Sequence, residues 1–242
     1  KKHTRRISKN SAMISIIIPA YNAARTIKKC LASISMQTFR DFEIIVVNDG
    51  STDTTRKILE ECPHNFTIID QENRGAPAAR NHGAKPAHGK YFIFCDADIV
   101  LRPDCLEKMM HALEEHPDVS YAYSSFKFGW KKFKLWPFDA TRLKRMPYIH
   151  TTSLIRVKHF PGFDEEIKRL QDWDLWLTML EQGHTGIWIP EGLFKVFSTN
   201  GTMSTWLPTF IYKLPTWLGL HPKAATRYNE AVARIKKKHR LT

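Results

Sequence analysis

The sequence predicts an α/β domain in which a mostly parallel β-sheet carries helices on both faces. Short runs of apolar, β-branched and aromatic residues alternate with segments of helical periodicity, which is typical of βαβ units. These runs are apolar at nearly every position, as expected of strands that are buried on both faces. The chain has 242 residues, of which 43% are hydrophobic and 25% charged, so it can bury one substantial core.

The first half of the chain justifies this fold class element by element. Strands are predicted at 13–19, where Pro19 is expected to end the strand, within 42–53, and at 66–70, 90–95 and 119–123. Helical spacing or helix-start signals predict helices at 23–38, 54–62, 75–85 and 103–116. Strands and helices therefore alternate up to Tyr123, as a parallel sheet requires.

The pattern is less regular after Tyr123. Residues 126–149 mix aromatic and basic side chains with a single acid, Asp139. Further elements are predicted as a strand at 150–157, an amphipathic helix at 172–183, two short strands at 185–190 and 193–198, and a last helix at about 223–238. We therefore expect a basic tail (1–12), an α/β domain (13–200, with halves 13–124 and 125–200) and a C-terminal aromatic and basic helical extension (201–242).

The net charge of +13 is concentrated at the two ends. Residues 1–10 and 234–240 each carry five basic residues and no acid. Such tails suit a nucleic acid or an anionic membrane face, or are simply solvated ends. No run approaches the roughly 18 apolar residues of a membrane span, and the basic start makes a poor signal peptide. We therefore expect a cytoplasmic protein, or one peripheral on the cytoplasmic membrane face.

The four cysteines fit this compartment. Cys30, Cys62, Cys95 and Cys105 form no CxxC pair and no spacing typical of metal ligands. We expect reduced core thiols rather than disulfides or a zinc site.

Polar clusters follow three of the predicted strands. They are Ala20-Tyr21-Asn22, Asn48-Asp49-Gly50 and Asp96-Ala97-Asp98. Ligands of open α/β sheets bind beyond the carboxyl ends of the strands, so we expect all three clusters to face one crevice.

The third cluster places two carboxylates directly after a buried strand. Burying them is costly and they repel each other, so a positive charge is expected there. Two oxygen ligands suit a hard cation, Mg²⁺ or Mn²⁺. The alternative is that Asp49, Asp96 and Asp98 only organise turns and cap helices.

Four segments occur in order over about residues 14–197: SIIIPAYN, VVNDGSTD, NRGAPAARNHGAKPAHGKYFIFCDAD and LQDWDLWL. Together they resemble the family 2 glycosyltransferases of the GT-A fold, which is Rossmann-like. The resemblance implies metal-dependent transfer of a hexose or N-acetylhexosamine, with inversion, from a nucleotide-sugar donor, expected to be UDP-linked. It implies as acceptor a hydroxyl of a glycan or lipid-linked glycan, as in polysaccharide biosynthesis.

The resemblance also assigns roles to individual residues. Nucleotide contacts fall to Pro19, Ala20, Tyr21 and Asn22, to Asp49 as acceptor from uracil N3–H, to Gly75, to Arg80 on the base or phosphates, and to Asp96 and Ala97. Asp98 would hold the metal on the diphosphate, with Asp96 contacting the ribose or a metal-bound water.

Asp172 matches the general base of the family. Members usually have Glu-Asp here, whereas this chain has Gln171-Asp172. Losing the neighbouring acid and standing at a helix start should both make Asp172 easier to ionise. The alternative is that Asp172 and Asp174 are only helix-start acids, and we expect Asp174 to be structural.

Three further residues are candidates for donor or acceptor contacts, namely His150, Gln171 and Trp173. Trp173 could stack on a sugar ring or pack in the core. His150 could face the donor or be a structural histidine at a strand start.

The aromatic and basic segments, within 126–149 and 201–242, allow three interpretations. They fit nucleic-acid binding, contact with an anionic membrane surface, or closure of the core by aromatics among solvated lysines. The family resemblance favours the membrane and makes nucleic acid a poor partner.

Two rival functions remain. A sugar nucleotidyltransferase would carry a Gly-rich, basic loop after the first strand, where this chain has PAYNAARTI. A non-catalytic binding module for nucleotide, membrane or nucleic acid would bind without turnover.

Overall fold

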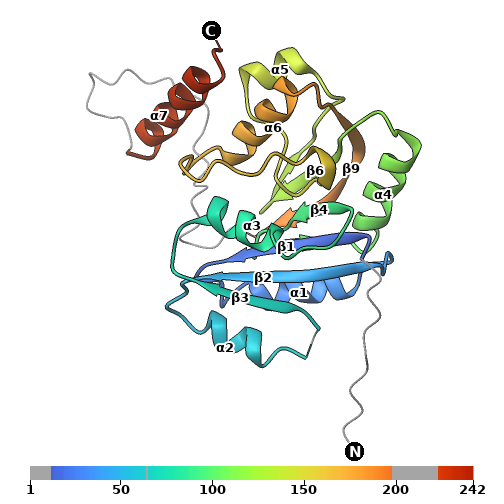
Figure 1. The fold of residues 1–242 in the computed structure, drawn as a ribbon, viewed down its shortest axis with the longest axis vertical. Helices are drawn as coiled ribbons and strands as arrows, with labels where there is room; N and C mark the ends of the chain where they lie inside the picture. The colour runs from blue at the N-terminus through green and yellow to red at the C-terminus, as the bar shows by residue number, and fades with distance from the viewer. Residues whose placement is uncertain (1–11, 64, 198–222, 242) are drawn as a thin grey trace, which may run out of the picture.

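A computed structural model describes residues 12–63, 65–197 and 223–241 of the chain. Nine strands of this part form one sheet in the order β3-β2-β1-β4-β8-β6-β9-β5, with β7 paired to β6 (Figure 1). The expected basic tail lies outside the described residues except for Ala12, as does the aromatic segment 203–222.

The first half of the sheet is parallel, as predicted. Strands β1 (Ile14–Ala20), β2 (Phe42–Asp49), β3 (Thr67–Gln71) and β4 (Tyr91–Phe94) pair in parallel. They are connected through helices α1 (Ile27–Ser35), α2 (Thr55–Glu60) and α3 (Ala76–Ala84). All seven residues of β1 are buried, which explains why its sequence is apolar throughout.

Strand β1 continues through Pro19 to Ala20, one residue beyond its predicted end. The Ile17 carbonyl accepts a hydrogen bond from the Cys95 backbone N–H (3.0 Å), so residues 17 and 19 direct their backbone polar groups toward β4. Pairing with β4 ends at Ile17. The N–H that proline lacks is therefore not needed at position 19.

The second half of the sheet is mixed. Its elements are β5 (Ile99–Leu101), α4 (Cys105–Glu115), β6 (Tyr121–Phe128), β7 (Lys131–Phe133), α5 (Ala140–Arg145), β8 (Leu154–Arg156), the short 3-10 helix η1 (Val157–His159), α6 (Gln171–Glu181), β9 (Gly186–Val196) and α7 (Lys223–Lys238). Strand β8 runs antiparallel to β4 and β6, whereas β6 and β9 are parallel.

One prediction for this half was wrong in detail, and two short strands were not predicted. The two short strands expected at 185–190 and 193–198 form one strand, β9, whose pairing with β6 shifts register around Ser125. The shift accommodates Pro190, which cannot donate to a regular ladder. Strands β5 and β7 were not predicted, because each has only three residues and therefore carries no periodicity.

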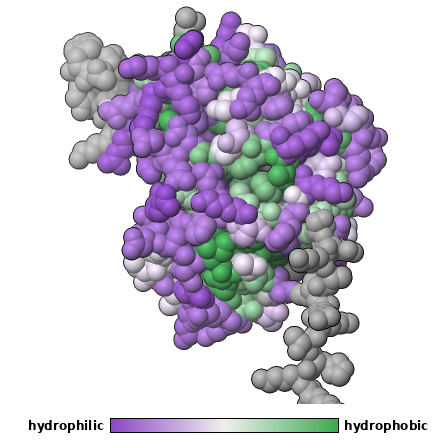
Figure 2. All heavy atoms as spheres, in the orientation of Figure 1, coloured by the Kyte–Doolittle hydropathy of each residue, from purple (hydrophilic) through white to green (hydrophobic). Residues whose placement is uncertain are grey.

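The two faces of the sheet carry separate cores. Ile16 and Ile18 pack with α1 and α4 on one face. Ile17 and Phe94 pack on the other face with a cluster that includes Trp176 of α6 and Ile235 of α7. Figure 2 shows a mainly hydrophilic face over the helices, with apolar residues visible over the lower part, where Figure 1 places β1 to β3.

All four cysteines are free thiols, as expected. The hydrogen bond with Cys30, together with burial, raises the pKa of Cys95, and burial raises that of Cys105. These thiols are therefore protonated and inert at neutral pH. No helix of the described residues combines the length and the apolar character that crossing a bilayer would need.

Candidate active site

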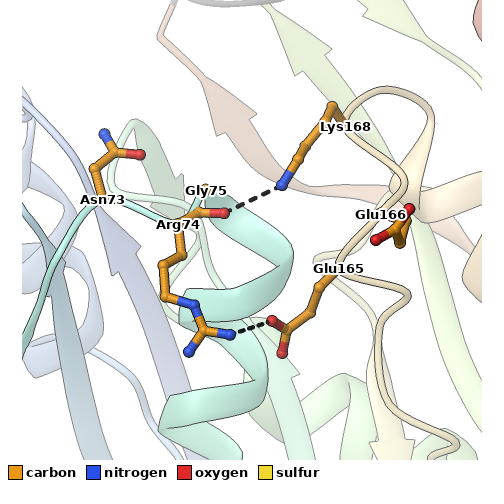
Figure 3. A pocket seen from close by; sticks show the side chains of 6 residues that line it. All are labelled: Asn73, Arg74, Gly75, Glu165, Glu166 and Lys168. Carbon is orange, nitrogen blue, oxygen red and sulfur yellow. Dashed lines mark hydrogen bonds and ion pairs between the residues drawn. The ribbon is translucent and has the colours of Figure 1, made fainter.

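A pocket of about 540 Å³ opens beside the end of β3, where the chain enters α3. Asn73, Arg74 and Gly75 line one side, and Glu165, Glu166 and Lys168 from the loop before α6 line the other (Figure 3). Arg74 pairs with Glu165 at 2.8 Å, and the Lys168 ammonium donates to the Arg74 carbonyl at 3.3 Å. These two contacts join the walls of the pocket.

Asp49, at the end of β2, holds the loop that forms this pocket. Its Oδ1 accepts hydrogen bonds from the Gln71 side chain (2.7 Å) and the Arg74 backbone (2.9 Å), and its Oδ2 accepts one from the Gly75 backbone (2.9 Å). A carboxylate offers about four acceptor positions, so one remains on Oδ2. Asp49 is 2% exposed, so the role that the structure shows is to organise the loop, as in the alternative interpretation, and the hydrogen bonds above leave one acceptor position on Oδ2 unused.

Gly75 begins α3 in a conformation with φ 91° and ψ 163°. This region of the backbone map is essentially restricted to glycine. A Cβ at Gly75 would meet no atom closer than 3.9 Å, so the requirement is conformational rather than steric. The conformation lets the Gly75 N–H reach Asp49.

The end of β1 contributes an ordered loop. Pro19 and Ala20 are buried within the strand, whereas Tyr21 is 52% exposed. Asn22 adopts φ 49°, and its Oδ1 accepts from the Thr52 backbone at 2.8 Å. Pro19 and Ala20 can therefore offer only backbone atoms to a ligand, and Asn22 fixes the neighbouring β2–α2 loop.

Arg80 of α3 is the buried centre of a second cluster. Arg80 is 4% exposed, and its guanidinium donates to Asp96 Oδ1 at 2.5 Å and to Gln171 Oε1 at 2.7 Å. Phe163 covers it at 5.2 Å. Its Nε is buried without a partner among the described residues. Arg80 thus joins the end of β4 to the start of α6.

Asp98 is a half-buried carboxyl two residues from Asp96. Burial and the negative charge of Asp96 raise the pKa of Asp98 to about 7. Ala97 between them is 7% exposed, so its side chain offers little to a ligand. The described residues contain no group of three or more His, Cys, Asp or Glu side chains able to hold a metal by themselves.

The two aspartates nevertheless fit a hard divalent cation that takes its remaining ligands from a diphosphate and water. Burial is the main cause of the raised pKa of Asp98 and the charge of Asp96 adds to it, so a cation beside the two carboxyl groups would favour their ionised forms.

Asp172 lies in the first turn of α6, where its Oδ1 accepts from the Trp173 backbone N–H at 2.8 Å. Burial nevertheless raises the pKa of Asp172 to about 6, so desolvation outweighs the factors that we expected to ease ionisation. Leu170 immediately before the helix adopts φ 57°. A left-handed leucine is uncommon and strained, and such strain clusters at functional sites.

The ring of His150 packs beside the stacked rings of Phe126 (5.3 Å) and Phe194 (5.1 Å). The pKa of His150 is lowered to about 4, mainly by burial. The negative charge of Asp96 opposes this shift, and the positive charge of Arg80 adds to it. The ring is therefore neutral at pH 7, and it lies close enough to Arg80 and Asp96 to sense their charges.

Trp173 does not face a sugar site. It is 1% exposed, and its indole N–H donates to the Leu143 carbonyl at 2.6 Å. The interpretation as a core residue is the one that the structure supports. Asp174 is structural, as expected: it accepts from Lys238 and from His239 (2.9 Å) at the end of α7.

The structure brings the predicted residues into two groups. Asp49 and Gly75 shape the pocket, and a second group of Asp96, Asp98, Asp172 and His150 surrounds Arg80. The charges of Arg80 and Asp96 act on each of the other three members, which shows that they are close together.

Sequence reasoning missed the far wall of the pocket. Nothing in the segment PGFDEEIKRLQ, residues 161–171, indicates that Glu165 and Lys168 meet Arg74.

The chain is similar to known proteins both in sequence and in fold. The family model described as "Glycosyl transferase family 2" matches residues 15–169. Glycosyltransferase GlyA of Streptococcus pneumoniae is 41% identical over 106 residues, covering 43% of this chain and 15% of that protein. Three of the curated relatives are each spanned over only 15% to 35% of their length.

Two solved structures share the fold. Staphylococcus aureus TarS (residues 1–349, in complex with UDP) has a TM-score of 0.67 at 22% identity, over 77% of this chain and 60% of that one. The mannosyltransferase PcManGT of Pyrobaculum calidifontis, in complex with GDP-Man and Mn²⁺, has a TM-score of 0.63 at 20% identity. The match covers 96% of this chain and 72% of that one.

Proposed function

The chain belongs to glycosyl transferase family 2, and on this premise we propose that it is a metal-dependent, inverting glycosyltransferase that uses a nucleotide-sugar donor. One observation carries the proposal. A buried arginine, Arg80, donates hydrogen bonds to Asp96, one of two carboxylates suited to a cation, and to Gln171, the residue before Asp172, whose carboxyl has a raised pKa. Departure of a nucleoside diphosphate and activation of an acceptor hydroxyl need these two kinds of group side by side.

The donor is UDP-linked in this proposal. The pocket beside Asp49 would take the base, because the free acceptor position on Oδ2 suits the single N3–H of uracil. The backbone of Arg74 and Gly75 would lie against the nucleotide, because both residues line the pocket. TarS, which shares the fold, has been crystallised with UDP and with UDP-GlcNAc. The same position can also accept the N–H of guanine, so a GDP-linked sugar is the outcome that would correct this choice.

Asp98 and Asp96 would hold Mg²⁺ or Mn²⁺. When bound, the cation neutralises the charge that develops on the departing diphosphate. Arg80 is already committed to Asp96 and Gln171, so its part is to position them. PcManGT, which is similar in fold, was crystallised with Mn²⁺.

Asp172 would act as general base. Its carboxylate would take the proton of an acceptor hydroxyl while that oxygen attacks the anomeric carbon of the sugar, and one displacement inverts the configuration. A pKa of about 6 keeps Asp172 mostly ionised at pH 7 and makes it a stronger base than an ordinary aspartate. The acceptor in this proposal is a hydroxyl of a glycan or lipid-linked glycan.

A thermal-shift panel of UDP- and GDP-sugars, with and without Mn²⁺, tests donor and metal together. Stabilisation by a UDP-sugar only in the presence of metal is the expected result. No stabilisation by any nucleotide sugar would contradict the proposal and favour a non-catalytic module. Release of UDP on addition of a glycan acceptor, followed by NMR of the new anomeric centre, then tests transfer and inversion.

A further inference from the structure

The β6–β7 hairpin, residues 126–134, presents a tryptophan at its tip. Strands β6 and β7 are joined by Gly129 and Trp130 alone, with Gly129 at φ 54°. Glycine at the first position of a two-residue turn is typical of tight hairpins. Trp130 next to it is fully exposed. An indole held entirely in water at the end of a projecting turn contributes nothing to the core of this domain.

The two faces of the hairpin differ. Phe126 and Phe133 are cross-strand partners whose rings stack at 4.9 Å, and Phe126 also stacks on Phe194 at 5.2 Å. This aromatic face is turned toward the domain. Side chains alternate along a strand, so Lys127 and Lys132 lie on the opposite face.

Lys127 and Lys132 are directly opposite each other and exposed. Like charges in this position repel and destabilise a hairpin. In the part of the chain that the structure describes, no ion pair is made by Lys127, Lys132 or the nearby exposed Lys134. An anionic surface would attract each of these lysines and so offset the repulsion between them.

We propose that the β6–β7 hairpin docks the protein on an anionic lipid bilayer, with Trp130 in the interfacial layer and Lys127, Lys132 and Lys134 on the headgroups. Tryptophan prefers that layer because its ring is apolar and its N–H is polar, and basic residues near it gain from anionic lipid. Lysines on an edge strand also prevent strands of different molecules from pairing, and Lys132 stands on such a strand, β7. That role accounts for Lys132 but not for Lys127, which is on the inner strand β6, or for the exposed indole.

Nucleic acid fits this surface less well. Single strands bind by stacking bases on open aromatic faces. Phe126 and Phe133 stack on each other and on the body of the domain, so only Trp130 is open.

Docking by the hairpin would bring the bilayer beside the reaction centre. Phe126 contacts the ring of His150 at 5.3 Å. The Gly129 N–H donates to the Val196 carbonyl, and the next residue, Phe197, donates its N–H to the Asp98 carbonyl at 2.8 Å. The hairpin is thus tied to the segment that carries the metal-site aspartate. This consequence rests on the proposed function and would favour a lipid-linked acceptor, whereas the docking itself does not depend on it.

Sedimentation of the full chain with vesicles tests the docking without any activity measurement. We expect binding to phosphatidylcholine vesicles that contain 30% phosphatidylglycerol and little binding to phosphatidylcholine alone. Lys127→Gln with Lys132→Gln should lower the partition coefficient roughly 30-fold. The matched control, Lys85→Gln with Lys90→Gln, removes the same charge at exposed positions around the turn that follows α3 and should change it less than twofold.

A second measurement addresses the indole. Lipids brominated on their acyl chains should quench part of the tryptophan fluorescence of the wild type, and Trp130→Ser should remove that part. Thermal melting of each variant confirms that it is folded. The proposal is overturned if both double variants bind vesicles like the wild type, because other basic segments would then hold the membrane. It is also overturned if the protein binds a polyanion such as heparin but no vesicle, or if quenching persists without Trp130.

Discussion

The pH dependence of transfer should report the ionisation of Asp172. With a pKa of about 6, the carboxyl is about nine-tenths ionised at pH 7 and about one-tenth ionised at pH 5. We therefore expect kcat/KM, measured at saturating Mn²⁺ so that Asp98 stays ionised, to fall about tenfold between pH 7 and pH 5. An aspartate at its ordinary pKa of 3.8 would lose only about 6% of its ionised form by pH 5.

The Asp172→Asn variant is the matched perturbation. Removing a general base costs about 10² to 10⁴ in rate, and the residual activity should no longer vary between pH 5 and pH 7. Binding of the donor and metal, measured by calorimetry, should change little, because Asp172 contacts neither in the proposed mechanism. A wild-type profile that stays flat down to pH 4.5 would refute the assignment of a buried base, as would transfer by Asp172→Asn at the normal rate.

Three further predictions concern the metal, the pocket and α7. Asp98→Asn should abolish the extra stabilisation that Mn²⁺ gives to a UDP complex, while binding of UDP in EDTA is unchanged by calorimetry. Gly75→Ala should lower the free energy of unfolding in urea by about 1–3 kcal/mol and weaken nucleotide binding. Gly183→Ala, also at positive φ but at the end of α6, should lower stability without changing nucleotide binding. Burial opposes the charge of His239, but hydrogen bonds to Asp174 and Glu181 outweigh it and raise its pKa. A raised pKa stabilises the docked α7 fully below about pH 6.5 and less as pH rises through the shifted value. Hydrogen exchange in α7, corrected for intrinsic rate, should therefore quicken between pH 6 and pH 8.5, and Asp174→Asn should weaken that dependence, leaving the part that Glu181 contributes.

The sequence identified the elements that carry long patterns. Strands β1, β2 and β4 are largely buried, so their composition had to be apolar, and the polar residues at their ends had to meet at one edge. The positions of Asp49, Asp96 and Asp98 follow from that geometry. The last helix was predicted at 223–238 and is observed there, because its spacing covers several turns.

Other features could not be read from local patterns. The pocket wall depends on a contact between Arg74 and Glu165, which are 91 residues apart in the chain. The opposing roles of Trp173 and Trp130 depend on where their elements face, since one indole is buried and the other fully exposed. The pKa of Asp172 depends on desolvation by the packed domain, which no neighbour in the sequence discloses.

The charge balance at the reaction centre connects these observations. Three carboxyl groups, those of Asp96, Asp98 and Asp172, surround a single buried cation, Arg80. If all three ionise, the cluster carries two uncompensated negative charges, and a divalent cation would balance them. A glutamate at position 171, as the resemblance leads one to expect, would add a fourth carboxylate and so a third uncompensated negative charge next to Arg80. Gln171 instead accepts the Arg80 hydrogen bond as a neutral amide, so the positive charge of Arg80 remains directed at Asp96. In the proposed mechanism, the glutamine therefore keeps Asp96 and Asp98 suited to one divalent ion and limits how far the pKa of Asp172 rises above the range useful for a base at neutral pH.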